Sequence, residues 1–283
     1  MSLDPFPSPG SCALRPALDR SINPPPGIAS PVFILGSPRS GTSVLVDALF
    51  AAGVSGFREG NLLGLLKPLY DRIDNHFASF ADPSGQTLIS QIQSESFKRA
   101  VRDFIKRELD RLNHRRPWLD KTCNCEAILV VPDLIEMWPK CRIIFARRRA
   151  IENIQSRLIK FSERDFKYHC LDWARNMSGW RRIRDSLEPW RYVEIDQRDV
   201  ILRPETVAQA IASLLALDDE TIARMKGAFV RLRPQQTAPG TAERVTALDK
   251  TGWTRAQMAD FNQICGPEMQ AYGYSLDRDY WTA

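Results

Sequence analysis

PVFILGSPRSGTS, the stretch at residues 31–43, joins a short apolar run to a loop of small and polar residues. The apolar run 31–35 predicts a buried strand, and the apolar spacing over 44–52 predicts a helix that ends near Gly53. Between them, Gly36 and Gly41 have the spacing of a nucleotide-binding P-loop, G-x-x-x-x-G-K-[ST]. Backbone N–H groups of such a loop and of the following helix N-terminus bind phosphate oxygens. The stretch therefore predicts a phosphate-binding strand–loop–helix unit.

The loop lacks one residue that phosphoryl transfer requires. Thr42 occupies the position where a P-loop NTPase has its lysine. Because that lysine binds the β- and γ-phosphates, its absence argues against ATP or GTP hydrolysis. Arg39 is a replacement cation inside the loop, since its planar guanidinium suits a tetrahedral anion.

The remainder of the chain alternates between strand and helix patterns. Further strands are predicted at 118–120, 142–146 and 192–195, and helices at 88–112, 126–138, 150–161, 169–187, 204–215 and 254–272. This alternation predicts one α/β domain in three layers, with helices on both faces of a central parallel sheet. We place the domain at 31–276, after a proline-rich arm at 1–30 and before a short tail at 277–283. A mostly helical insert at 61–116 is expected on the substrate side.

Composition excludes several classes of protein. The 283 residues carry 39 Lys and Arg against 34 Asp and Glu, and this mild charge of +5 implies no dedicated nucleic-acid surface. The longest apolar runs are too short to span a membrane, and we find no signal peptide. Six scattered cysteines and three isolated histidines match neither a disulfide framework nor a metal site. We expect a soluble, cytoplasmic protein without a metal.

Two elements together resemble the sulfotransferases that use 3′-phosphoadenosine 5′-phosphosulfate (PAPS). In that superfamily the motif P-x-S-G-T-[ST] holds the 5′-phosphosulfate, and a strand ending in arginine, with a serine eight residues later, binds the 3′-phosphate. Arg148 and Ser156 have this spacing, which favours Arg148 over Arg147. The loop motif is present as Pro38, Arg39, Ser40, Gly41, Thr42 and Ser43. The resemblance implies a P-loop-like fold, PAPS as donor and adenosine 3′,5′-bisphosphate (PAP) as product.

The resemblance also implies catalytic residues. Cytosolic small-molecule sulfotransferases have Lys-Thr-His with the histidine as base, but this chain has Lys121, Thr122 and Cys123 in that order. The arginine in its loop and Glu59 just past the loop helix are more similar to the tyrosylprotein sulfotransferase type. Glu59 is then the expected base. Lys121 and Arg39 are expected to stabilise charge on the departing phosphate.

Two further positions resemble parts of the family that contact the nucleotide. Tyr192, in the Tyr-Val-Glu run of the last predicted strand, is expected near the adenine, and Lys250 is expected to fold over the nucleotide. The acceptor is a small molecule, a sugar or a peptide, and the sequence does not choose among them. It leaves the oligomeric state open as well.

Two other functions remain compatible with the residues. The first is a small-molecule kinase with a degenerate P-loop, in which Asp120 would serve Mg²⁺. The second is a non-catalytic binder of nucleotides or polyanions, suggested by the charge of +5 and by the arginine triplet at 147–149.

Overall fold

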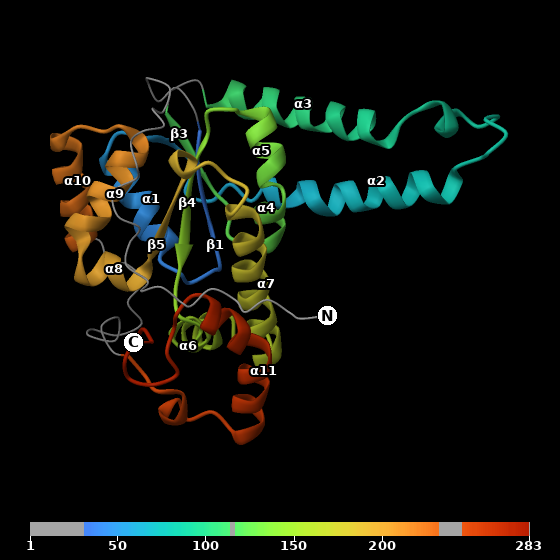
Figure 1. Ribbon diagram of the computed structural model, residues 1–283. Helices are drawn as coiled ribbons and strands as arrows, with labels where there is room; N and C mark the ends of the chain where they lie inside the picture. Colours follow the sequence, from blue (N-terminus) through green and yellow to red (C-terminus); the bar gives the residue numbers. More distant parts are fainter. Residues whose placement is uncertain (1–30, 114–116, 232–244, 283) are drawn as a thin grey trace, which may run out of the picture.

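The computed structural model describes residues 31–113, 117–231 and 245–282 (Figure 1). The arm predicted at 1–30 lies outside this part of the chain. At the centre is a parallel sheet in the order β2-β3-β1-β4-β5. Its strands are β1 (Val32–Gly36), β2 (Ser55–Gly56), β3 (Trp118–Lys121), β4 (Arg142–Arg147) and β5 (Tyr192–Asp196). The predicted α/β class and parallel sheet are confirmed.

Successive side chains of the central strands enter two different cores, because side chains alternate across a sheet. Val32, Ile34 and Ile144 pack on one face of the sheet, while Phe33 and Phe145 pack on the other. All five are fully buried. Continuous apolar runs such as 32–35 are what a sheet covered on both faces requires.

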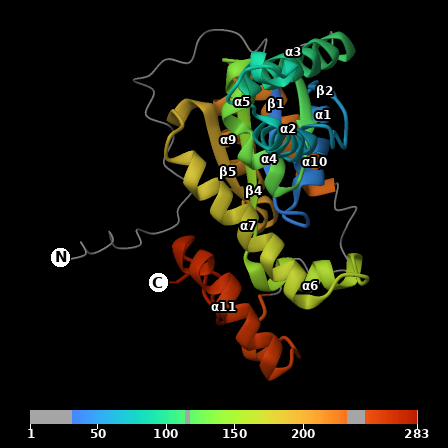
Figure 2. The ribbon, with the colours of Figure 1, turned by 90° about the vertical axis from the view of Figure 1, so that its right-hand side faces the viewer.

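Helices cover both faces (Figure 1). The first layer comprises α1 (Thr42–Ala51), α8 (Gln197–Leu202), α9 (Pro204–Leu215) and α10 (Asp219–Arg231). The second comprises α4 (Cys125–Leu129), α5 (Val131–Met137), α6 (Ala150–Lys160), α7 (Phe166–Arg184) and α11 (Arg255–Ala271). Figure 2 shows α11 lying beside α7, against which it packs.

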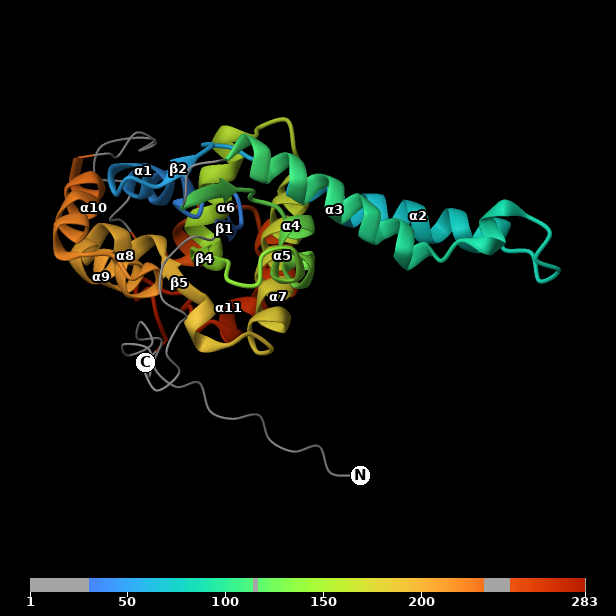
Figure 3. The same cartoon turned by 90° about the horizontal axis from the view of Figure 1, so that it is seen from above.

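The insert at 61–116 contains a helical hairpin. It consists of α2 (Leu66–Phe80) and α3 (Ser94–Leu112), with short 3₁₀ helices η1 (Leu63–Leu65) and η2 (Leu88–Gln91). Figures 1 and 3 show this hairpin extending away from the sheet and its covering helices. The predicted helix at 88–112 therefore begins six residues later, at Ser94, after a turn of 3₁₀ helix.

The helix predicted at 126–138 is two helices, divided at Val130. Pro132 explains the break, because proline has no N–H to donate and its ring clashes with the carbonyl four residues earlier. Proline in the first turn of α5 removes only a donor that would have lacked a partner. The sequence also missed β2, α2, α8 and α10.

The described residues contain no helix long and apolar enough to cross a membrane. Within the same residues, His, Cys, Asp and Glu side chains form no group of three suited to a metal ion.

We predict that Gly36→Ala destabilises the protein strongly. Gly36 has φ 144°, and a Cβ there would lie 2.2 Å from the carbonyl oxygen of Ala146 on β4. Strain and overpacking should lower the free energy of unfolding by about 2–4 kcal/mol, measured by urea denaturation. Gly266→Ala is the control, because nothing lies within 4 Å of that position in α11, and alanine there should be neutral or slightly stabilising. Equal effects of the two substitutions would contradict the prediction.

Candidate active site

The phosphate loop joins β1 to α1 as the sequence predicted. Gly36 ends the strand, and Gly41, with φ 85°, is the N-cap of α1. Because Gly41 has no side chain to cap the helix, the N–H groups of the first turn keep room for a ligand. Arg39 also has a positive φ, 71°, which is uncommon for a residue with a Cβ. The loop therefore has a conformation that suits an anion at the start of α1.

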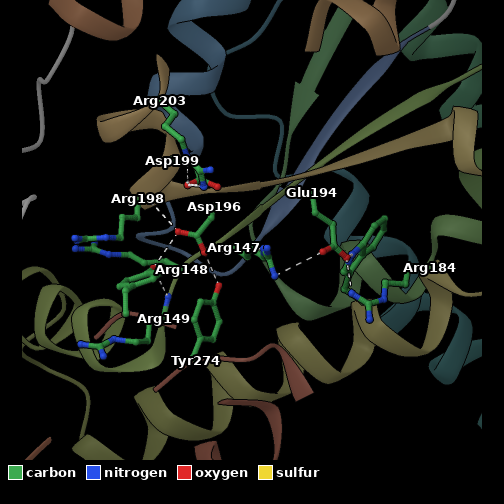
Figure 4. A network of polar contacts seen from close by, with 12 residues as sticks. Arg147, Arg148, Arg149, Arg184, Glu194, Asp196, Arg198, Asp199, Arg203 and Tyr274 are labelled. Carbon is green, nitrogen blue, oxygen red and sulfur yellow. Dashed lines mark hydrogen bonds and ion pairs between the residues drawn. The ribbon is translucent and has the colours of Figure 1, made fainter. Parts of the chain in front are cut away.

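The three consecutive arginines at 147–149 point in three directions (Figure 4). The guanidinium of Arg147 lies 3.8 Å from Glu194 and 4.0 Å from Asp196, inside the protein. Arg149 is buried and donates to the carbonyl oxygen of Ser275 near the C-terminus, at 3.0 Å. Arg148 instead donates from Nη1 to the carbonyl oxygen of Arg39 in the phosphate loop, at 3.0 Å. Arg148 is thus the member of the triplet that contacts the loop.

Ser156 lies at the same loop. Its hydroxyl, on α6, accepts a hydrogen bond from Nε of Arg39 at 2.9 Å. Burial lowers the pKa of the Arg148 and Arg39 guanidinium groups, and the charge of Arg148 lowers the pKa of Arg39 further. Among the described residues, Nε of Arg148 is buried and has no hydrogen-bond partner. Two half-buried positive charges and one buried, unused donor favour a bound anion at this point.

Glu59 and Lys121 meet on the other side of β1. Lys121 is buried at the end of β3, next to Ile34 in register, and its ammonium forms an ion pair with the carboxylate of Glu59. Glu59 is 57% exposed, so its carboxylate can be reached from solvent. Cys123 donates to the hydroxyl of Thr42 at 3.3 Å, which ties the turn after β3 to the first residue of α1. The Lys-Thr-Cys run is therefore adjacent to the phosphate loop.

The segment that carries Glu59 is fixed to the end of β3. The N–H of Gly60 donates to the carbonyl of Lys121 at 2.9 Å, and the N–H of Asn61 donates to the Thr122 hydroxyl at 3.1 Å. That hydroxyl in turn donates to the carboxylate of Asp120 at 2.8 Å. These bonds place Glu59 beside Lys121.

A model of the sulfotransferase family matches residues 31–221. The chain belongs to this family. Its reaction is the transfer of a sulfuryl group, and the predicted superfamily is confirmed. The match favours neither the kinase nor the non-catalytic binder, and the resemblance to the tyrosylprotein type stays a prediction.

A solved structure supports the fold. The sulfotransferase STF9 from Mycobacterium avium superposes with a TM-score of 0.54 at 16% identity, covering 89% of this chain and 79% of that chain. The mouse sulfotransferase SULT7A1, complexed with PAP, gives a TM-score of 0.48 at 15% identity, with 86% of each chain covered. No curated protein matches the chain by sequence.

The sequence predicted two further residues at the nucleotide, Tyr192 and Lys250. Tyr192 is buried at the amino end of β5, paired with Ile143 and against the ring of Trp180, with ring centroids 5.4 Å apart. The phosphate loop follows the carboxyl end of β1, so the length of a five-residue strand, roughly 15 Å, separates the two. The expected contact of Tyr192 with adenine stays a prediction. Lys250 is exposed and pairs with Asp249 at 3.2 Å, so its expected role stays a prediction.

Gln197 lies at the loop and was missed. It follows the carboxyl end of β5, and its Cγ lies 3.0 Å from the point where a Cβ on Gly41 would stand. The sequence contained a usable signal, because residues just after parallel strands form ligand sites in open α/β sheets. The predicted strand at 192–195 implies that the turn after it, which carries Gln197, lies at this edge of the sheet.

The C-terminal residues of the sulfotransferase support the arginine triplet (Figure 4). The buried carboxylate of Asp196 accepts hydrogen bonds from the hydroxyls of Tyr274, at 2.6 Å, and Tyr280, at 3.0 Å. The Tyr280 hydroxyl also accepts from the N–H of Arg149 at 2.9 Å. Tyr280 falls in the predicted tail at 277–283, and it is buried. The end of the chain therefore holds the 147–149 segment in place.

We predict an unusual pH dependence of stability from Asp120. Burial, with a contribution from the charge of Glu59, raises the pKa of this carboxyl from its usual 3.8 to about 6, although the Thr122 hydroxyl opposes the shift. Because the folded state then holds the proton more tightly than the unfolded state, Asp120 lowers the free energy of unfolding as pH rises from about 4 to about 6. Asp120→Asn should remove this loss, so the variant gains up to about 3 kcal/mol relative to wild type across that interval.

Urea denaturation at several pH values measures the effect. Asp103→Asn is the control, because Asp103 is an exposed aspartate on α3. Parallel stability curves for wild type and Asp120→Asn would contradict the prediction.

Proposed function

We propose that this sulfotransferase takes the sulfuryl group from PAPS and transfers it to a hydroxyl or amine acceptor by in-line displacement. The observation that carries the proposal is the pair of contacts that join Arg148 and Ser156 to Arg39. They put two places suited to anions side by side, one at the start of α1 and one between β4 and α6. A nucleotide with phosphate at both its 5′ and 3′ positions matches such a pair.

The residues present fit this nucleotide. The loop at 38–43 and the first turn of α1 would hold the 5′-phosphosulfate through backbone N–H groups. The guanidinium of Arg148, whose buried Nε has no partner among the described residues, would hold the 3′-phosphate together with Ser156. When bound, PAPS supplies the sulfuryl group.

The proton chemistry falls to Glu59. It would accept the proton of the acceptor hydroxyl on its exposed carboxylate, which makes the acceptor oxygen a better nucleophile. Lys121 and Arg39 would place positive charge where negative charge develops on the phosphate oxygen as its bond to sulfur breaks. In the structure the ammonium of Lys121 forms an ion pair with the carboxylate of Glu59, so the two groups are already in contact. These cations provide the charge stabilisation, and we propose that no metal takes part.

The acceptor would be a small molecule, a sugar or a peptide that reaches the exposed carboxylate of Glu59. We place its pocket beside the insert at 61–116. A screen of these acceptor classes with ³⁵S-labelled PAPS would identify the class.

We predict that the protein binds PAP more tightly than AMP and that Arg148 is responsible. A charge-assisted contact to the 3′-phosphate should be worth about tenfold to a hundredfold in affinity. Isothermal titration should show this preference in wild type and its loss in Arg148→Gln. Arg203→Gln is the control, since Arg203 pairs with Asp199 on α8 and is 48% exposed. Binding of PAP no tighter than AMP by wild type would refute the 3′-phosphate site.

We predict that Glu59→Gln lowers kcat about 10²- to 10⁴-fold, the usual contribution of a general base. The affinity for PAP, measured by titration, should stay within about twofold because Glu59 is not expected to touch the nucleotide. Glu163→Gln serves as the control, as Glu163 is an exposed glutamate paired with Arg164. Normal turnover by Glu59→Gln would exclude it as the base.

A further inference from the structure

Two buried polar residues of α6 lie beneath the phosphate loop without belonging to the proposed site. Asn153 is fully buried and Arg157 is 2% exposed. They stand three residues before and one residue after Ser156 on the same helix. Burying an amide and a guanidinium costs free energy unless their hydrogen bonds are made, so their partners indicate what they do.

Those partners are in the loop. Nδ2 of Asn153 donates to the carbonyl oxygen of Pro38 at 3.0 Å and to the hydroxyl of Ser40 at 3.1 Å. Arg157 donates from Nε to the same Pro38 carbonyl at 3.3 Å and from Nη2 to the Ser37 hydroxyl at 2.7 Å. Two side chains of α6 thus converge on one backbone carbonyl. Nη2 of Arg157 also donates to the carboxylate of Asp172 on α7 at 2.5 Å, and this bond fixes the position of the guanidinium.

The carbonyl they hold belongs to the peptide that precedes Arg39. In a trans peptide the C=O and the following N–H point in opposite directions. With the Pro38 carbonyl held toward α6, the N–H of Arg39 must point away from α6. Arg39 itself has φ 71°, a conformation that costs free energy for a non-glycine residue and persists where its surroundings enforce it. The donors of α6 provide that enforcement.

We propose that Asn153 and Arg157 are positioning residues that hold the phosphate loop in its anion-binding conformation before the nucleotide arrives. The proposal rests on the proposed function, because it takes the 5′-phosphate of an adenine nucleotide as the group that the loop binds. On this proposal Asn153 and Arg157 increase the affinity for the 5′-phosphate without touching it, because they hold the loop that binds it. Arg148 and Ser156 would still bind the 3′-phosphate through their own side chains.

This separation gives a test with two probe ligands. PAP carries both phosphates, whereas adenosine 3′-monophosphate lacks the 5′-phosphate. Isothermal titration should show that Asn153→Leu lowers the affinity for PAP about tenfold. The same variant should leave the affinity for adenosine 3′-monophosphate within about twofold, because the side chains proposed to bind the 3′-phosphate are unchanged. Leucine keeps the size of the side chain and removes the donor.

Ser37→Ala provides a second, smaller change, because it removes the hydroxyl that Arg157 holds and leaves both α6 side chains intact. It should reduce PAP affinity in the same selective way, by about threefold. Arg191→Lys is the matched control. Arg191 is also a buried arginine that donates to a backbone carbonyl, that of Pro139 at 2.7 Å, but it precedes the amino end of β5. Neither ligand should bind differently to this variant.

The outcomes separate this inference from the proposed function. If wild type binds PAP no more tightly than AMP, the proposed function fails, and this inference with it. If wild type prefers PAP but folded Asn153→Leu and Ser37→Ala bind it normally, the positioning role alone is refuted. Equal weakening of both nucleotides would likewise refute it, because that pattern indicates a general loss of structure.

Discussion

The hydrogen bond from Arg148 to the carbonyl of Arg39 joins two parts of the chain that are 109 residues apart. One is the loop after β1, and the other is the turn after β4. The two strands are neighbours in a parallel sheet, in register from Val32 to Gly36, so their carboxyl ends must arrive together. Because the strands pair in this way, Arg148 reaches the phosphate loop. Ser156, on the helix that follows Arg148, then lies close enough to bond Arg39.

Much of the buried polar structure serves to fix these two turns. Arg147 and Arg149 are buried, and each is held by several groups, among them Glu194, Asp196 and carbonyl oxygens of the C-terminal residues. With its neighbours anchored, the backbone at Arg148 has little freedom, and Trp173 adds a hydrogen bond to its carbonyl at 3.0 Å. A guanidinium positioned in advance loses less conformational entropy when it binds an anion.

The sequence predicted the fold where periodicity and glycine spacing were strong. Buried strands such as 32–35 and 142–146 are continuous apolar runs, and the loop at 36–43 has a motif with few alternatives. Prediction failed where tertiary contacts decide. Two-residue β2 has no pattern of its own. The break at Val130 is different, because Pro132 marks it in the sequence itself. Tyr192 was expected near the adenine by resemblance alone, and the register of β5 puts it at the amino end of its strand, away from the phosphate loop. Its contact with the nucleotide stays a prediction.

The buried partners of the loop show a second limit of sequence reasoning. Asn153 and Arg157 stand on α6, which the sequence correctly predicted as a helix at 150–161. Nothing local to the sequence tells which side chain of this helix faces a loop more than a hundred residues away. Their burial becomes visible only when α6 is packed against the phosphate loop and α7.

The central place of β1 in the order β2-β3-β1-β4-β5 divides the site into two halves. Glu59 and Lys121 belong to the β2–β3 half, while Arg148, Ser156 and Gln197 follow β4 and β5. Under the proposed function, one flank recognises the universal donor and the opposite flank meets the molecule to be modified. Acceptor specificity can therefore change through substitutions in β2, β3 and the α2–α3 hairpin inserted between them, while the sulfuryl donor stays the same.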